Sequence, residues 1–140
     1  MIYKDKKRLQ IALRRLYTTK APSKEILPLV GIDKAGFINH INKFLLSGMT
    51  ETNFGVEWGL DHIVPAHIFD STNITDLALC YNYNNIMPMW NSDNRLKGAS
   101  VHFSLTKLDS METNEHIQKL KNKCYSEINR VYQKYLLTSY

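Results

Sequence analysis

The sequence predicts an α+β fold in which two short strands in the middle of the chain are embedded among helices from both ends. Three observations predict it: helical periodicity in residues 3–18 and 113–137, strand-like residues in 57–64 and 86–90, and turn residues between these segments. The chain has 140 residues, of which 44% are apolar, with six glycines and four prolines. This length and composition favour one globular domain, residues 1–140, over a disordered chain.

The first helix, residues 3–18, is predicted to be amphipathic because Leu9, Leu13 and Leu16 recur on one face. The first 20 residues also contain seven lysines and arginines and one aspartate, within a net charge of +5 for the whole chain. This charge indicates either a solvated helix face or a surface that binds a polyanion. The candidate contacts for a polyanion are Lys6, Lys7, Arg14 and Arg15.

Two short helices are expected next. Ser23 is a candidate N-cap for a helix that ends before Pro28, and Asp33 for a second helix that ends at Gly48. The second helix would bury Phe37, Ile41, Phe44 and Leu45. Residues 22–47 therefore fit either simple core packing or a helix-turn-helix, a shape that binds DNA.

The centre of the chain predicts a hairpin followed by a helix. After a turn at residues 53–55, the first strand (57–64) is stopped by Pro65, and residues 66–83 are expected to be a loop with one helical turn near 76–80. Residues 86–90 form the antiparallel return strand. Asn91 or Ser92 then caps a helix that carries residues 94–97 and ends at Gly98.

A long amphipathic helix is predicted near the C-terminus, over residues 113–137. Its apolar positions alternate spacings of three and four: Ile117, Leu120, Cys124, Ile128, Val131 and Tyr135. Such a helix covers its own core or pairs with a partner, and we expect the first, with Tyr125, Tyr132 and Tyr135 packing. The domain thus divides into a basic helical part (1–48), a central unit (53–100) and the last helix (111–138).

Several classes of protein are not expected. No run of eighteen apolar residues exists and the first ten residues are too charged for a signal peptide, so we expect a soluble, cytoplasmic protein. Cys80 and Cys124 are isolated from each other and from metal-ligand spacings. We therefore expect two reduced thiols and neither a zinc site nor a disulfide.

A group of polar residues carries the candidate chemistry. Asp61 and His62 are adjacent near a strand end, and Asn85 and Asn94 follow, nine residues apart. A carboxylate, an imidazole and amide oxygens can build a phosphodiesterase site with one metal ion. Because neighbouring residues of a regular strand point to opposite faces, we expect the strand to distort at Asp61 and His62, or the pair to lie just past its end.

These residues resemble the HNH endonucleases. Residues 61–65 (DHIVP) are similar to the family's first strand, Asn85 to its middle asparagine, and residues 94–98 (NRLKG) to its last helix. The step from Asn85 to Asn94 is similar to that in the HNH domain of CRISPR effector nucleases. Further likeness, over residues 29–100, is to small bacteriophage HNH proteins, from which the chain departs at Glu51 and His67.

The resemblance implies a ββα-metal unit in which Asp61 and Asn94 hold one Mg²⁺ or Mn²⁺ ion. It implies that His62 is the general base, which suits an imidazole because it titrates near neutral pH, and that Asn85 braces His62 by hydrogen-bonding backbone across the loop. Arg95 and Lys97 would contact phosphates. The expected activity is hydrolysis of DNA to 5′-phosphate and 3′-hydroxyl ends. We expect the DNA to be double-stranded.

The sequence leaves alternatives to DNA hydrolysis open. A non-catalytic DNA-binding protein could use residues 22–47, and an RNA-cleaving nuclease is equally compatible because nothing in the sequence recognises a 2′-hydroxyl. His67 could approach a phosphate or the metal, although we expect an exposed loop histidine, and we expect His40 to be hydrogen-bonded at the edge of the core. The oligomeric state is open between monomer and homodimer, and a phage-encoded protein would act in the host cytoplasm.

Overall fold

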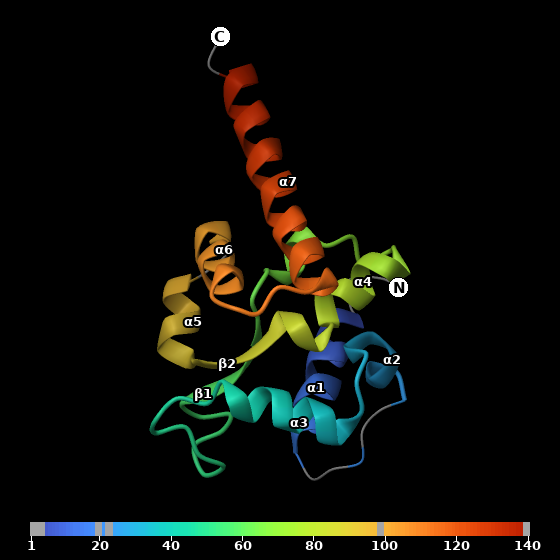
Figure 1. Ribbon diagram of the computed structural model, residues 1–140, viewed down its shortest axis with the longest axis vertical. Helices are drawn as coiled ribbons and strands as arrows, with labels where there is room; N and C mark the ends of the chain where they lie inside the picture. Colours follow the sequence, from blue (N-terminus) through green and yellow to red (C-terminus); the bar gives the residue numbers. More distant parts are fainter. Residues whose placement is uncertain (1–4, 19–20, 22–23, 98–99, 139–140) are drawn as a thin grey trace.

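The computed structural model describes residues 5–18, 21, 24–97 and 100–138, without the side chains of residues 5 and 95–97. Over these residues the fold is α+β: an antiparallel pair of strands is surrounded by helices (Figure 1). The helices are α1 (Asp5–Tyr17), α2 (Ile26–Val30), α3 (Lys34–Lys43), α4 (Ile74–Tyr81), α5 (Asn91–Lys97), α6 (Val101–Asp109) and α7 (Glu115–Thr138). The strands are β1 (Trp58–His62) and β2 (Ile86–Trp90), and two 3₁₀ turns are η1 (Ala66–Ile68) and η2 (Tyr83–Asn85).

The N-terminal helix α1 forms as the sequence predicts, with Leu9, Leu13 and Leu16 fully buried. It lies beside the hairpin, because the side chain of Gln10 donates a hydrogen bond of 3.4 Å to the carbonyl of Leu60. Burial of three leucines on one face stabilises this docking by several kcal/mol, at roughly 1.5–3 kcal/mol for each buried side chain.

The spacing predicts that helix α2 ends before Pro28. This prediction is wrong, because the helix contains Pro28. Pro28 is the third residue of the helix, where its missing N–H would have no partner within the helix. The helix ends at Gly31, whose N–H donates to the carbonyl of Leu27 at 3.0 Å and whose positive φ of 77° turns the following chain out of the helix. The predicted cap at Ser23 lies outside the described residues.

Helix α3 begins at the predicted cap, where Asp33 accepts a hydrogen bond from the N–H of Gly36 at 2.8 Å. It ends at Lys43 and not at Gly48: Phe44 leaves the helical conformation, and Gly48 belongs to a later turn with φ of 93°. Phe37 and Ile41 are buried, and Lys34 donates a hydrogen bond of 2.8 Å to the carbonyl of Leu16 at the end of α1. These contacts pack α3 against α1, as the core-packing alternative for residues 22–47 predicts.

Strands β1 and β2 pair in a continuous register from Trp58 opposite Trp90 to His62 opposite Ile86. Pro88 stands in the middle of β2, opposite Leu60. Residues 66–83 are more helical than predicted: η1 occupies residues 66–68, and α4 runs for eight residues from its cap at Asn73, whose side chain accepts from the N–H of Asp76.

Two helices follow α5. Helix α6 is absent from the sequence prediction, whereas α7 forms where it is expected, with Ile117, Leu120 and Cys124 buried. The expectation that all of α7 packs on its own core is wrong. Its C-terminal half extends beyond the other elements (Figure 1), and the apolar side chains there are exposed: Tyr125, Ile128, Val131, Tyr132, Tyr135 and Leu137.

Candidate active site at the hairpin

Asp61 and His62 are the last two residues of β1 and lie on opposite faces of the hairpin. Burial alternates along β1, and the pairing with β2 continues without a bulge through His62. The expected distortion of the strand at this pair is therefore wrong. The ladder stays regular because the inward face, with Trp58 and Leu60, is fully packed up to its end.

His62 points into the core and is 5% exposed. Its ring contacts the ring of Tyr81 from α4 edge to face, with centroids 4.9 Å apart. Burial raises the pKa of the Tyr81 hydroxyl well above its usual range, so this phenol stays neutral at physiological pH.

Asn85 is completely buried and makes the backbone hydrogen bonds across the loop that the sequence predicts. Its Oδ1 accepts from the N–H of Val64 at 2.8 Å, and its Nδ2 donates to the carbonyls of Val64 at 3.2 Å and Cys80 at 2.9 Å. Its own carbonyl accepts from the N–H of Ile63 at 2.7 Å. The two residues after His62 are thus fixed to the residue before β2.

The hydrogen bonds of Asn85 clamp the backbone after His62, and Ser104 on α6 adds one more bond to this clamp. Sequence reasoning missed Ser104. Its buried hydroxyl donates a hydrogen bond of 2.6 Å to the carbonyl of Ile63. A signal for α6 does exist, because Ser100 caps the helix by accepting from the N–H of Phe103, and Val101, Leu105 and Leu108 follow at helical spacing.

Asn94 is exposed on α5, the helix that begins directly after β2. Asn91 fixes the start of α5 against the start of β1: its N–H donates to the carbonyl of Glu57 at 2.9 Å, and its side chain to that of Val56 at 2.8 Å. A Cβ on Gly59 would lie 3.9 Å from the Asn91 side-chain oxygen, so the first residue of α5 lies beside the face of β1 that carries Gly59 and Asp61.

The two proposed metal ligands, Asp61 and Asn94, therefore belong to the same side of the hairpin. Their carboxylate and amide oxygens fit a hard cation that keeps several waters, because Asp61 is half-buried and Asn94 is exposed. Across the described part of the chain, no cluster of three or more His, Cys, Asp or Glu side chains could hold a metal.

The basic candidates on α1 differ in their surroundings. Lys7 and Arg15 are exposed, and Lys6 is partly buried. Arg14 is exposed and lies over the Phe54 ring, 5.7 Å from its centroid, in the turn before β1. The side chains of Arg95 and Lys97 lie outside the described residues.

The histidines outside the hairpin lie as the sequence predicts. His67 is exposed on η1. His40 is partly buried between the rings of Phe44 and Tyr83, and its Nε2 makes a hydrogen bond of 3.0 Å with the carbonyl of Ile86. Burial lowers the His40 pKa. A structural role for His40 at the edge of the core is confirmed by these contacts.

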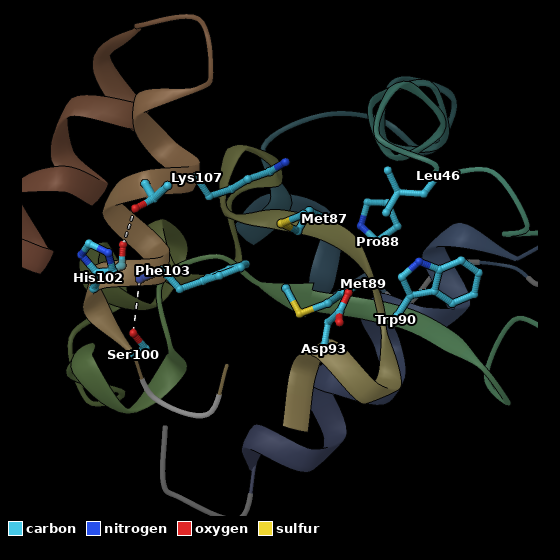
Figure 2. Close-up of a pocket in the computed structure, with 11 residues that line it drawn as sticks. Leu46, Met87, Pro88, Met89, Trp90, Asp93, Ser100, His102, Phe103 and Lys107 are labelled. Atoms are coloured by element: carbon cyan, nitrogen blue, oxygen red, sulfur yellow. Dashed lines mark hydrogen bonds between the residues drawn. The ribbon is translucent and has the colours of Figure 1, made fainter. Parts of the chain in front are cut away.

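An apolar hollow lies along β2, beside the proposed site. It has a volume of about 610 Å³ and is bordered by Trp90, Phe103 and Lys107, with Asp93 at its rim next to Asn94 in the sequence. Figure 2 shows the side chains of α6 on one side of the hollow and Trp90 and Leu46 on the other. Sequence reasoning missed this feature because four of its eleven lining residues come from α6.

Comparison with known proteins gives a distant relative of unknown role. The chain is 27% identical over 99 residues to the uncharacterized protein L426 of Acanthamoeba polyphaga mimivirus. The match covers 71% of this chain and 44% of that protein, so the chain spans less than half of the relative's length. No protein-family model matches the chain, and no solved structure matches it significantly. Among the helices of the described residues, none has the length and apolarity needed to cross a bilayer.

Proposed function

We propose that this chain is an HNH-type endonuclease that hydrolyses DNA with one Mg²⁺ or Mn²⁺ ion. The observation that carries the proposal is the order strand, clamped loop, strand, helix, with Asp61 on the face of β1 beside which the Asn94 helix begins. The clamp by Asn85 supports it further, since Asn85 fixes the backbone that directly follows His62.

In the proposed reaction a water oxygen attacks phosphorus, its proton passes to His62, the bond to the 3′ oxygen breaks, and that oxygen takes a proton from solvent. Because His62 is buried on the inner face of the hairpin, its side chain has to turn toward the Asp61 face before it can act as the base. The products are a 5′-phosphate and a 3′-hydroxyl end. Asp61 and Asn94 would hold the cation, which would neutralise charge that develops on the scissile phosphate and the departing oxygen. Asn85 and Ser104 hold the backbone of Val64 and Ile63, the two residues after His62, in place.

The basic surface of α1 is the proposed source of affinity. The exposed Lys7, Arg14 and Arg15 lie on the helix that contacts β1 through Gln10. Contacts of such side chains with phosphates release counterions, so binding weakens steeply as salt increases.

Cleavage of supercoiled plasmid tests this proposal. We expect the wild-type protein to cut with Mg²⁺ or Mn²⁺ and to lose cutting with EDTA, and His62→Ala to cut roughly 100- to 10,000-fold more slowly, the usual contribution of a general base. The matched control is His116→Ala, which removes a histidine on α7, away from the hairpin, and should leave the rate within about twofold.

Other outcomes are informative. Cutting that survives in His62→Ala would remove this residue as the base. If the protein binds plasmid but does not cut it with either metal, the non-catalytic DNA-binding alternative is favoured instead. Cleavage of a matched RNA but not of DNA would move the proposal to an RNA nuclease.

A further inference from the structure

The outer half of α7 carries a continuous apolar stripe on the surface. The inner half buries its apolar residues up to Cys124, but six apolar side chains beyond it are about half exposed or more, and five of these lie on one face. They are Tyr125 at 52%, Ile128 at 45%, Val131 at 51%, Tyr132 at 55% and Tyr135 at 65%. Apolar side chains gathered on one face of a projecting helix are typical of a surface that binds another helix.

We propose that this stripe pairs with the same stripe of a second copy of the chain, with the two α7 helices antiparallel. The inference does not depend on nuclease activity. Its first support is the spacing. From Cys124 the stripe continues at 128, 131 and 135, so the steps are four, three and four residues, the seam of a two-helix coiled coil.

An antiparallel register makes the seam self-complementary. When Ile128 lies opposite Val131 of the second copy, Val131 lies opposite Ile128 of that copy, and β-branched side chains meet in both central layers. In the same register Tyr125 lies beside Tyr132 of the second copy, on one flank of the seam. Each copy therefore supplies both members of every pair, as a two-fold interface requires.

Charge on the other flank selects this orientation. Glu127 and Lys134 are seven residues apart, at equivalent positions of successive heptads. In the antiparallel register Glu127 lies opposite Lys134 of the second copy, and this pair occurs twice. In a parallel pair Glu127 would instead lie beside Tyr132, and neither charge would gain a partner.

The intrachain contact of Glu127 is compatible with this arrangement. Its Oε1 accepts a hydrogen bond of 2.5 Å from Arg130, one turn along the helix. An ionised carboxylate has about four acceptor sites, so a lysine from the second copy adds to this pair without displacing it. The stripe is short, and we therefore expect association in about the micromolar range, as for small interfaces.

Sedimentation equilibrium of the full chain over a concentration series tests the proposal. We expect a monomer–dimer equilibrium for the wild type and a monomer at all concentrations for Ile128→Glu. Gln133→Glu, which adds the same charge on the exposed side of α7 away from the seam, should keep the wild-type equilibrium. A monomeric wild type, or a dimer that Ile128→Glu leaves intact, would overturn the proposal. Circular dichroism checks that the variants keep their helices.

A charge exchange tests the orientation. Lys134→Glu should weaken the dimer roughly fivefold, since it places two carboxylates together twice. The double variant Glu127→Lys with Lys134→Glu should restore the wild-type affinity, because the reversed pairs still match. If the double variant is as weak as the single one, the antiparallel register is wrong.

Discussion

The two faces of the β1–β2 hairpin differ in how firmly their polar groups are held. On the inner face, His62 packs on Tyr81, and the backbone after it is bound by Asn85 and Ser104, both completely buried. On the outer face, Asp61 is half-buried and Asn94 is exposed. In the proposed enzyme the cation ligands therefore lie nearer to solvent and substrate, and the base has to turn out of the inner face to meet them.

The largest effect is expected for Asn85→Ala, which would test how much the inner face depends on the clamp. The change removes three hydrogen bonds and leaves buried backbone groups of Val64 and Cys80 without partners, at a cost of about 3 kcal/mol or more. Urea denaturation measures the loss. Asn39→Ala, an exposed asparagine on α3, is the control and should change the free energy of unfolding by less than about 0.5 kcal/mol.

Ser104→Ala should lower the free energy of unfolding by less, about 1–2 kcal/mol. The change removes the hydrogen bond to the buried carbonyl of Ile63 but leaves little cavity. Thr106→Ala is the control, since the Thr106 hydroxyl is exposed and bonds only to the carbonyl of His102 in its own helix. Equal stability of the two variants in thermal unfolding would argue against the Ser104 clamp.

A pH dependence is expected from His40, at the edge of the inner face. Burial lowers its folded pKa below the ordinary value of 6.5, so the unfolded chain binds the proton more readily. Stability is therefore complete above pH 6.5 and decreases as the pH falls from there through the lowered folded pKa. His40→Gln should flatten this part of a plot of unfolding free energy against pH, and an unchanged slope would contradict the assignment.

The smallest effect on stability is expected at the outer face. Asp61→Asn should change the free energy of unfolding by less than about 1 kcal/mol, because the side chain is only half-buried and the replacement has nearly the same shape. The same variant should lose metal-dependent cutting of plasmid. A strong loss of stability would mean that Asp61 belongs to the structural face, and the comparison between the two faces would fail.

Most of the fold follows from local patterns in the sequence. Apolar periodicity predicts α1 and α7, and the side chain of Asp33 caps α3 as expected. The strand at residues 86–90 is predicted with its correct ends. These elements succeed because each depends on residues within a few positions of one another.

The errors arise where tertiary contacts decide. Pro28 indicates a helix end in general, but in the first turn of α2 it costs no hydrogen bond. The periodicity of α7 does not reveal that the body of the protein ends near Cys124. For the site, the sequence predicts the Asn85 brace, but the inward direction of His62 depends on how the hairpin packs against α4.

Pro88 limits the addition of further strands to the hairpin. The carbonyls of Leu60 and Ile86 point away from the partner strand, toward Gln10 and His40. In the alternating pattern of an antiparallel pair, Pro88 opposite Leu60 then turns its backbone nitrogen to the open side of β2. A nitrogen without hydrogen offers nothing to an incoming strand, so the two-stranded ribbon resists growth into a larger sheet or an aggregate.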